Sequence, residues 1–281
     1  MSVKIIVDST ADIPAELMKE FTVVPLTVRF GDEEYLDGVG ITRRQFYEKL
    51  VESDVMPQTS QVPPANFEAC FKKTVDAGNT AVVITVSSKL SGTFQSAVIA
   101  SEEFEDSIFI VDSRSVAIGT GILAQYALHL RNEGKTAAEI AAELESVRDN
   151  ICVIALLDTL EYLKKGGRIS ATAAFAGGLL SIKPVAAVED GEIKLLGKAR
   201  GSKQGNNLLI KMIDEKGGID FSMPILLGYT GLSDVMLKKY VEDSRFLWEA
   251  GGTEPEYTMI GSVIGAHAGP GAIAAAFFKN A

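Results

Sequence analysis

Four short apolar segments, each separated from the next by a stretch of helical character, constrain this chain most strongly. They read VKIIV at 3–7, AVVITV at 81–86, SIFIVDS at 107–113 and ICVIALL at 151–157. Apolar strands that alternate with helices are typical of a largely parallel sheet covered by helices on both faces. We therefore predict a three-layer α/β domain over residues 1–157.

The pattern changes after residue 157. The stretch SIKPVAAVEDGEIKLLGKAR at 181–200 predicts two strands joined by an Asp-Gly turn, which is a strong hairpin signal. A helix, the strand PILLGYT at 224–230, another helix and a glycine-rich tail follow. This order predicts a smaller α+β domain over residues 158–281, with a tail that can pack back on the first domain.

Several shorter signals lie between these segments. TVVPLTVRF at 22–30 predicts a strand and GDEEYLDG after it a turn or hairpin. Capping boxes at 42–45 and 136–139 each predict a helix start. QTSQVPP at 58–64 predicts a polar loop.

Charge and residue counts exclude several classes of protein. The formal net charge of −10 is the wrong sign for a protein that binds nucleic acid through its phosphates. The only cysteines, Cys70 and Cys152, are far apart and accompanied by two histidines, so neither a disulfide framework nor a zinc site is expected. A reducing compartment, and hence a cytoplasmic location, is the natural expectation.

One segment is long enough to cross a bilayer. Residues 259–278 carry no formal charge, but four glycines and a proline interrupt them. We expect a buried, glycine-punctuated segment there, which excludes a membrane span but allows transient contact with a membrane.

Polar clusters follow the predicted strands at residues 8–10, 87–93 and 112–113, and Thr59 and Ser60 lie on the longest irregular loop. Open parallel sheets bind ligands beyond the carboxyl ends of their strands. Each single hydroxyl is better explained as a helix cap than as a ligand contact. A helix needs only one cap, however, and SSKLSGT at 87–93 offers four hydroxyls, so for the set as a whole ligand contact has at least as much support.

Nucleophilic catalysis has little support in the sequence. A serine nucleophile needs a base held by a third group, and no GxSxG elbow is present. His129 falls within a predicted helix, which leaves a serine-dependent acyl hydrolase or transferase using Ser91 and His267 as the alternative enzyme hypothesis. No phosphate-binding loop is present, GTGILA at 119–124 lies within a helical stretch, and KKGGR at 164–168 is interpreted as a solvated turn.

These motifs, taken in order, resemble the DegV family. The resemblance rests on VDST at 7–10, TSQ at 59–61, SSKLSGTFQSA at 87–97, VDS at 111–113, LEYLKKGGRIS at 160–170 and GAHAGPGA at 265–272. It implies a two-domain fold that binds a long-chain fatty acid such as palmitate in a buried tunnel, without a cofactor or metal. It also implies a non-catalytic role, in which a separate fatty acid kinase subunit of the DAK-like type converts the presented carboxylate to an acyl phosphate for phospholipid synthesis.

The resemblance also implies roles for particular residues. Thr59 and Ser91 hold the fatty-acid carboxylate, with His267 nearby. Ser60, Gly92 and Thr93 are additional candidates for the ligand site, and Arg200 in KARGSK matches a position that contacts the kinase. Many relatives have a proline directly after TSQ, whereas this chain has Val62, which leaves the role of Ser60 less well defined than that of Thr59.

Overall fold

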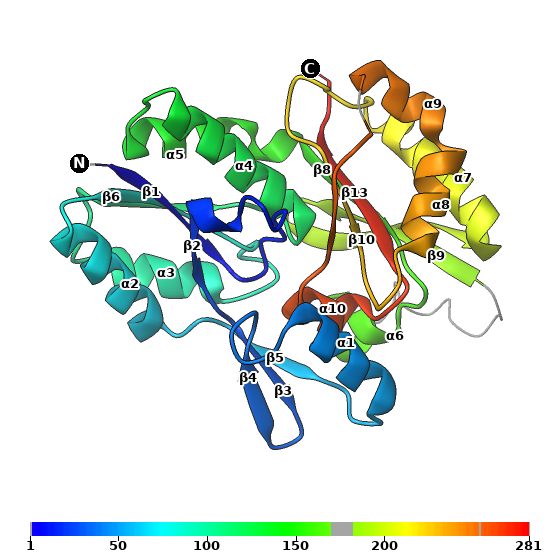
Figure 1. Cartoon of the computed structure of the whole chain (residues 1–281), viewed down its shortest axis with the longest axis horizontal. Helices are drawn as coiled ribbons and strands as arrows, with labels where there is room; N and C mark the ends of the chain where they lie inside the picture. The colour runs from blue at the N-terminus through cyan, green and yellow to red at the C-terminus, as the bar shows by residue number, and fades with distance from the viewer. Residues whose placement is uncertain (1, 170–181, 253, 281) are drawn as a thin grey trace.

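The computed structural model describes residues 2–169, 182–252 and 254–280. A four-stranded parallel sheet lies in the N-terminal half, in the order β2-β1-β6-β7 (Figure 1). Helices α2 and α3 cover one face of this sheet, and α4 and α5 cover the other. The elements are β1 (Val3–Asp8), β2 (Phe21–Val24), β6 (Thr80–Thr85), β7 (Ile108–Asp112), α2 (Pro64–Asp76), α3 (Thr93–Ser101), α4 (Ile118–Asn132) and α5 (Ala137–Val147).

A second, mixed sheet has six strands in the order β10-β9-β8-β13-β11-β12. Helices α7, α8 and α9 pack on one face of it, and α4 packs on the other. The elements are β8 (Ile151–Leu156), β9 (Ile182–Glu189), β10 (Glu192–Arg200), β11 (Leu226–Tyr229), β12 (Tyr257–Met259), β13 (Ile273–Phe278), α7 (Gly201–Glu215), α8 (Val235–Asp243) and α9 (Arg245–Trp248).

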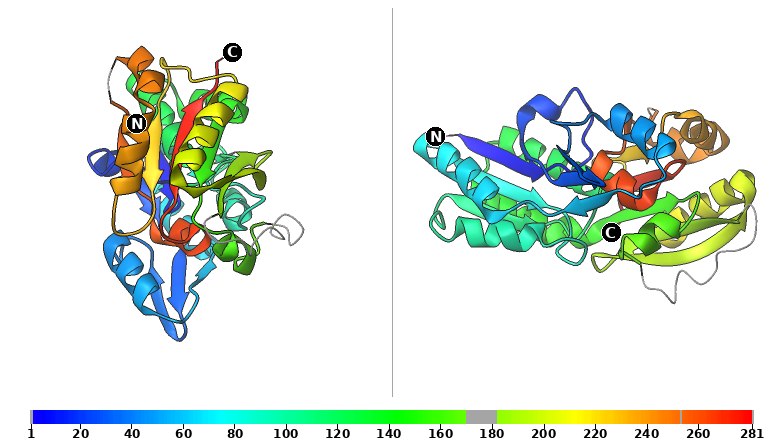
Figure 2. Two further views of the ribbon diagram at one scale, coloured as in Figure 1. Left: turned by 90° about the vertical axis from the view of Figure 1, so that its right-hand side faces the viewer. Right: turned by 90° about the horizontal axis from the view of Figure 1, so that it is seen from below.

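A small antiparallel sheet, ordered β4-β3-β5, projects from the molecule together with α1. Helix α10 packs against α1, α6, β3 and β5, and Figures 1 and 2 show it between the small sheet and the rest of the molecule. The elements are β3 (Thr27–Phe30), β4 (Glu33–Leu36), β5 (Gln58–Ser60), α1 (Arg43–Glu52), α6 (Glu161–Lys165) and α10 (Ser262–Ala268), with short 3-10 turns at Met18–Glu20, Arg148–Asn150 and Glu249–Gly251.

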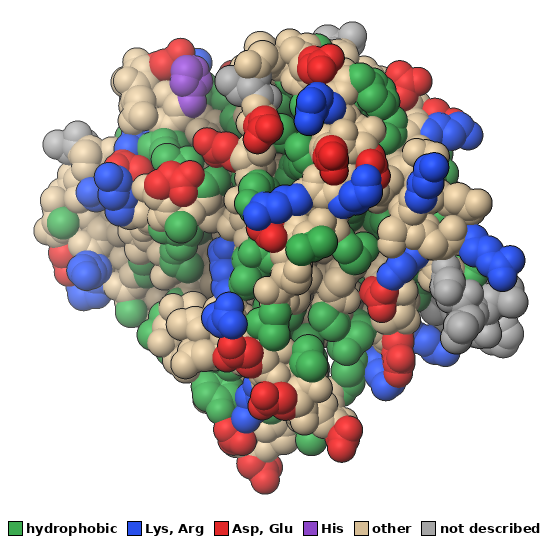
Figure 3. Space-filling view, turned by 45° about the vertical axis from the view of Figure 1, so that its right-hand side comes forward, with side chains coloured by type: hydrophobic (Ala, Val, Ile, Leu, Met, Phe, Trp, Pro, Cys, Tyr) green, Lys and Arg blue, Asp and Glu red, His purple; other side chains and the backbone are tan. Residues whose placement is uncertain are grey.

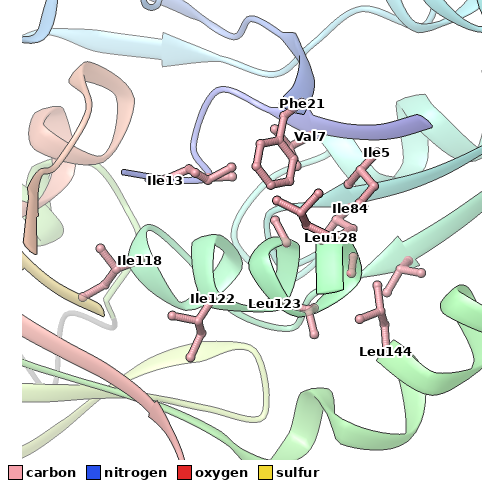
Figure 4. Close-up of a cluster of buried hydrophobic side chains, with 14 of the residues drawn as sticks. Ile5, Val7, Ile13, Phe21, Ile84, Ile118, Ile122, Leu123, Leu128 and Leu144 are labelled. Carbon is pink, nitrogen blue, oxygen red and sulfur yellow. The ribbon is translucent and has the colours of Figure 1, made fainter. Parts of the chain in front are cut away.

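Helix α4 belongs to the cores of both large sheets. Its apolar side chains meet those of β1 and β6 in the cluster drawn in Figure 4, and the same helix contacts β8, β11 and β13. Two glycines allow this close approach, because a Cβ at Gly121 would lie 2.1 Å from the carbonyl oxygen of Asp12, and one at Gly119 would lie 2.3 Å from Val153. The letters GTGILA therefore serve helix packing.

Several local predictions are confirmed. Thr42 with Gln45 and Thr136 with Glu139 form complete capping boxes at the starts of α1 and α5. The predicted hairpin is β9–β10, with Asp190 and Gly191 both at positive φ. The predicted GDEEYLDG turn is the β3–β4 hairpin.

Other local predictions are wrong. TVVPLTVRF is not one strand, because the chain breaks around Pro25 and continues in a different sheet. The loop predicted at 58–64 begins with β5, whose residues Gln58–Ser60 pair with β3. Backbone pairing to a neighbouring strand compensates there for the polar side chains.

The strand ICVIALL does not extend the first sheet as we expected. It forms β8, which pairs antiparallel with β9 and β13 in the second sheet. The division of the chain into domains 1–157 and 158–281 remains a proposal. Strand β8, however, is hydrogen-bonded to C-terminal strands and is part of their sheet.

The uncharged segment 259–278 is interrupted as expected. Helix α10 ends before Gly269, which has a φ of 71°, and β13 follows Pro270 and Gly271. Within the described residues, no helix combines the length and apolarity needed to cross a membrane.

Candidate ligand-binding site

A cavity lies where the three sheets approach one another. Strand β5, helix α10, the segments after β1 and β6, and one face of the second sheet all contribute to its wall. Its volume of about 120 Å³ is several times the roughly 10–15 Å³ that one water molecule requires. Most of the lining side chains are apolar, and the polar ones include Thr59, Ser60, Ser91, Arg168 and His267.

Small side chains make room for the cavity on the second sheet. Ala155 on β8 is paired in register with Ala186 on β9 and with Ala274 on β13. All three residues line the cavity. Neighbouring residues in register point to the same face of a sheet, so the three alanines form a row with little side-chain volume. We call Ala155, Ala186 and Ala274 the alanine row.

Thr59 and His267 contact each other at the polar end of the cavity. Thr59 Oγ1 lies 2.8 Å from His267 Nε2. Burial, assisted by the nearby Arg168 guanidinium, lowers the pKa of His267 to about 4, so the ring is neutral at pH 7. Within the described part of the chain Nδ1 is buried without a hydrogen-bond partner.

The unpartnered Nδ1 indicates which tautomer is present. A buried donor without an acceptor is costly, so the proton is best assigned to Nε2, which then donates to Thr59 Oγ1. This arrangement leaves the Thr59 hydroxyl proton available to a ligand. Gly166 leaves room for the His267 ring in this position, since a Cβ at residue 166 would lie 2.2 Å from His267 Nδ1.

Ser91 is placed in a similar way. Its Oγ accepts the Thr93 backbone N–H at 3.3 Å and lies 2.9 Å from Thr93 Oγ1. Thr93 Oγ1 itself accepts the backbone N–H of Val62 at 3.4 Å, so each of the two hydroxyl oxygens accepts one backbone N–H and either hydroxyl can donate to the other. When Thr93 donates, the hydroxyl proton of Ser91 is free for a ligand. Ser91 contributes both to the start of α3 and to the cavity wall.

Arg168 is a site residue that the sequence interpretation missed. It lines the cavity, donates from Nε to the carbonyl oxygen of Leu90 at 3.2 Å, and forms no salt bridge within the described residues. The interpretation of KKGGR at 164–168 as a solvated turn is therefore wrong at its last residue. A guanidinium that pairs with no acidic side chain of the described residues, beside the hydroxyls of Thr59 and Ser91, makes this end of the cavity suitable for a carboxylate.

The other candidate residues fall into two groups. Gly92 and Thr93 support the wall, since Thr93 orients Ser91 and a Cβ at Gly92 would lie 2.0 Å from Gln61 Oε1. Arg200 lies outside the cavity, exposed at the end of β10 and the start of α7.

The remaining strand-end clusters are structural. Asp8 accepts hydrogen bonds from the Val86 N–H at 2.7 Å and from the Thr10 N–H at 2.9 Å, and so joins the ends of β1 and β6. Asp112 Oδ1 accepts from the backbone N–H groups of Ser88 and Arg114. These contacts stabilise the loops at the strand ends and cap no helix, because α3 and α4 begin without a side-chain cap hydrogen bond. Thr10 also reaches the cavity wall.

The geometry offers no support for a serine nucleophile. His267 contacts Thr59 rather than Ser91, and its lowered pKa makes it a weak base. A third group that would orient His267 through Nδ1 is not found among the described residues. The same part of the chain holds no group of three or more His, Cys, Asp or Glu side chains arranged around a possible metal ion.

Comparisons with known proteins match this architecture over nearly the whole chain. A DegV protein from Thermus thermophilus, described as binding fatty acid, superposes with a TM-score of 0.86 at 29% identity and covers 99% of this chain and 100% of that chain. A stearic-acid-binding protein from Eubacterium ventriosum superposes with a TM-score of 0.85 at 27% identity, covering 99% of each chain.

The sequence comparisons agree. A DegV domain-containing protein of Caldanaerobacter subterraneus is 35% identical over 99% of each chain. A protein-family model described as "Uncharacterised protein, DegV family" matches residues 2–280 of the sequence. The chain therefore belongs to the DegV family.

Proposed function

We propose that this protein binds one long-chain fatty acid, with its alkyl chain in the cavity and its carboxylate at the end formed by Thr59, Ser91, His267 and Arg168. The observation that carries the proposal is a mostly apolar cavity with the Thr59 and Ser91 hydroxyls at one end, where donation from His267 leaves the Thr59 hydroxyl proton free. The fatty acids bound by the structural neighbours from T. thermophilus and E. ventriosum support it.

The energies are consistent with this ligand. Burying a sixteen-carbon chain at about 0.8 kcal/mol per methylene provides roughly 12 kcal/mol before the costs of association. An unpartnered buried carboxylate would cancel several kcal/mol of this. Two hydroxyl donors offset that cost, and Arg168 adds a charge-assisted contact. The alkyl chain then provides affinity, and the polar end fixes the position of the carboxylate.

The proposed role is that of a carrier. The site has donors for a carboxylate but no activated nucleophile, so we propose that a separate, DAK-like fatty acid kinase subunit phosphorylates the bound carboxylate in the cytoplasm, for use in phospholipid synthesis. Arg200 is a suitable contact for that kinase, because it is exposed at the end of the β9–β10 hairpin, whose residues Ala186 and Ile193 line the cavity.

Mass spectrometry of a solvent extract of the purified protein tests fatty-acid binding. We expect close to one fatty acid per chain, and rebinding of palmitate after delipidation. If no fatty acid is extracted and none rebinds, the proposal fails. The hydrolase alternative predicts instead that a fluorophosphonate probe labels Ser91 covalently, whereas the carrier predicts no labelling.

Substitution of Arg200 tests the kinase contact. With a fatty acid kinase subunit and ATP, Arg200→Ala is expected to keep its bound fatty acid but to lower acyl-phosphate formation by roughly tenfold or more, as for a central interface arginine. Lys203→Ala, an equal loss of charge at an exposed position three residues along α7, is the matched control. Equal effects of the two substitutions would argue against a specific contact at Arg200.

A further inference from the structure

A buried polar cluster outside the cavity holds the segment that leads into α10. Asp12 Oδ1 accepts the Gly261 N–H at 2.7 Å and pairs with Arg43 at 3.1 Å. Asp37 Oδ1 accepts the Ser262 N–H at 3.3 Å. We call Asp12, Asp37 and Arg43 the acid–arginine cluster.

Helix α1 extends the same anchorage. Arg43, its first residue, donates to Thr258 Oγ1 at 3.0 Å and to the carbonyl oxygen of Met259. One turn later, the buried Tyr47 hydroxyl donates to the carbonyl oxygen of Ile260 at 3.0 Å. Every residue from Thr258 to Ser262 is therefore bound by a side chain of α1 or of the acid–arginine cluster.

The fit around this segment is close. A Cβ at Gly261 would lie 3.2 Å from Asp12 Oδ1 and 3.7 Å from Asp37 Oδ2, so both carboxylates face the same glycine. A Cβ at Gly265, one turn into α10, would lie 2.6 Å from the Tyr47 hydroxyl. Because so little space is left, a change in the cluster must be transmitted to the position of α10.

Helix α10 is also the part of the cavity wall that carries His267. Ile260, Val263, Ile264 and His267 line the cavity, whereas none of the cluster residues does. The cluster thus contacts one end of a seven-residue helix, and the Thr59–His267 contact lies near the other.

The acid–arginine cluster contains more buried polar groups than are needed simply to hold α10 in place. The charged and titratable groups that face Asp12 are Arg43, Asp37, Asp8 and Tyr47, which sets three buried carboxyl groups against one guanidinium. Asp12 Oδ2 is buried without a hydrogen-bond partner within the described residues. Apolar packing anchors a helix at lower cost, so a strained polar anchor indicates a requirement for position.

We propose that the Asp12–Arg43 ion pair is a positioning device for α10, which sets how firmly the cavity retains its ligand although neither residue touches that ligand. The inference rests on the proposed function because it takes a fatty acid as the ligand. The position of His267, however, can be measured in the protein without any ligand. The ion pair holds the 258–262 segment, α10 follows rigidly, and His267 is brought against Thr59.

Arg43→Gln tests this proposal, and Arg44→Gln is its matched control. Both remove one positive charge from the first turn of α1, but Arg44 is exposed and pairs only with Glu48 in the described structure. Two readouts are taken: retention of palmitate, and the titration of the His267 imidazole by NMR in the delipidated protein. The chain has only one other histidine, the exposed His129, which serves as an internal reference.

We expect Arg43→Gln to weaken palmitate retention by roughly tenfold, a typical effect of breaking a buried charged contact, and to move the His267 titration up toward the ordinary histidine value. Arg44→Gln is expected to change neither. An unchanged His267 titration in folded Arg43→Gln would overturn the proposal. If the wild type binds no fatty acid, the proposed function fails. The His267 titration in Arg43→Gln then still shows whether the ion pair positions α10.

Two further variants separate positioning from general stability. Arg43→Lys keeps the charge but replaces the guanidinium fork that reaches Asp12, Thr258 and Met259 by one ammonium group, so it is expected to recover only part of the retention lost in Arg43→Gln; equal losses in the Lys and Gln variants would contradict a role for charge. In a Thr59→Ala background, Arg43→Gln is expected to add little, because both act through the Thr59–His267 contact. Additive losses would show that Arg43 does not act through this contact.

Discussion

At the scale of single residues, the hydrogen bonds that the polar side chains already form with each other determine how they can bind a ligand. Thr59 accepts from His267, so its own hydroxyl can donate to a ligand, and Ser91 Oγ accepts the Thr93 backbone N–H beside a hydroxyl with which it shares one hydrogen bond. The partners are fixed by the fold rather than by the ligand. A carboxylate entering this end therefore finds donors that need little reorganisation, which favours binding.

Ser91→Ala removes one of these donors. We expect fatty-acid retention to weaken by about 1–3 kcal/mol, the cost of leaving a buried polar group unpaired, with a smaller change in the stability of the empty protein. Fluorescent fatty-acid displacement and thermal unfolding measure the two effects. Ser88→Ala, on the same loop but exposed, is the control. A large loss of apo stability with normal lipid content would mean that Ser91 serves only α3.

The pKa of His267 predicts a dependence of stability on pH. The folded-state value of about 4 lies below the ordinary value of 6.5 that the unfolded chain retains. The unfolded chain therefore binds a proton that the folded chain does not, and the His267 contribution is complete above pH 6.5 and is lost as pH falls toward 4. The loss amounts to up to about 3 kcal/mol.

Urea unfolding of wild type and His267→Gln at several pH values isolates this contribution. Burial raises the pKa of Asp12 to about 7, and a raised carboxyl pKa acts in the opposite sense, losing its stabilising contribution as pH rises toward 7. The difference between the two proteins cancels that effect. Parallel stability curves from pH 7 to pH 4 would mean that His267 is not buried as a neutral ring.

Residue chemistry alone identified part of this site. The surplus of hydroxyls at 87–93 and the histidine in GAHAGPG led to residues that line the cavity. Arg168 was missed because a cation after two glycines and two lysines has the pattern of a solvated turn. Arg168 faces the cavity because its Nε donates to the carbonyl oxygen of Leu90. These two residues are 78 positions apart in the chain, so the local sequence pattern does not indicate the contact.

At the scale of elements, the alanine row determines how much space the second sheet leaves. Its members come from three strands that are distant in sequence, and each faces the cavity. On β13 the neighbouring Ala275 points to the opposite face, where it is fully buried against the core under α7 and α8. Adjacent alanines on one strand thus have different roles, since side chains alternate between faces.

Ala155→Leu and Ala275→Leu form a matched pair of substitutions. Ala155→Leu is expected to fill the cavity and to exclude long-chain fatty acids while the protein stays folded, because the added carbons occupy empty space. Ala275→Leu overpacks the core and should destabilise the protein by about 1–3 kcal/mol. Bound lipid by mass spectrometry and unfolding free energy are the measurements. Normal loading with palmitate in Ala155→Leu would place the alkyl chain elsewhere.

The elements that the sequence predicts correctly are those specified by neighbouring residues. Capping boxes and the Asp190-Gly191 turn act within a few positions, so their signals are complete in the sequence. Strand partners are not specified in this way. ICVIALL has the apolar character of a parallel strand, yet β8 pairs antiparallel with strands that occur later in the chain.

At the scale of the whole molecule, the ligand site depends on all three sheets. The small sheet contributes Thr59, the end of the first sheet leads to Ser91, and the second sheet contributes the alanine row. Helix α4 joins the two large sheets through one core (Figure 4). Acidic and basic side chains are interspersed on the face in Figure 3, so the charge of −10 does not form a field of one sign there.

The position of β13 between β8 and β11 also affects how the chain is made. The four strands of the first sheet are complete at Asp112, whereas the second sheet lacks an internal strand until residues 273–278 emerge from the ribosome. At ~5–20 residues per second, the roughly 160 residues between these points take about 8–30 s to synthesise. Until β13 is made, α4 lacks the contacts that this strand provides, and β8 lacks its neighbour on the side away from β9. The unpaired edges of β8 and β11 therefore stay exposed to aggregation until residues 273–278 are made, and β13 both completes the sheet and ends that exposure.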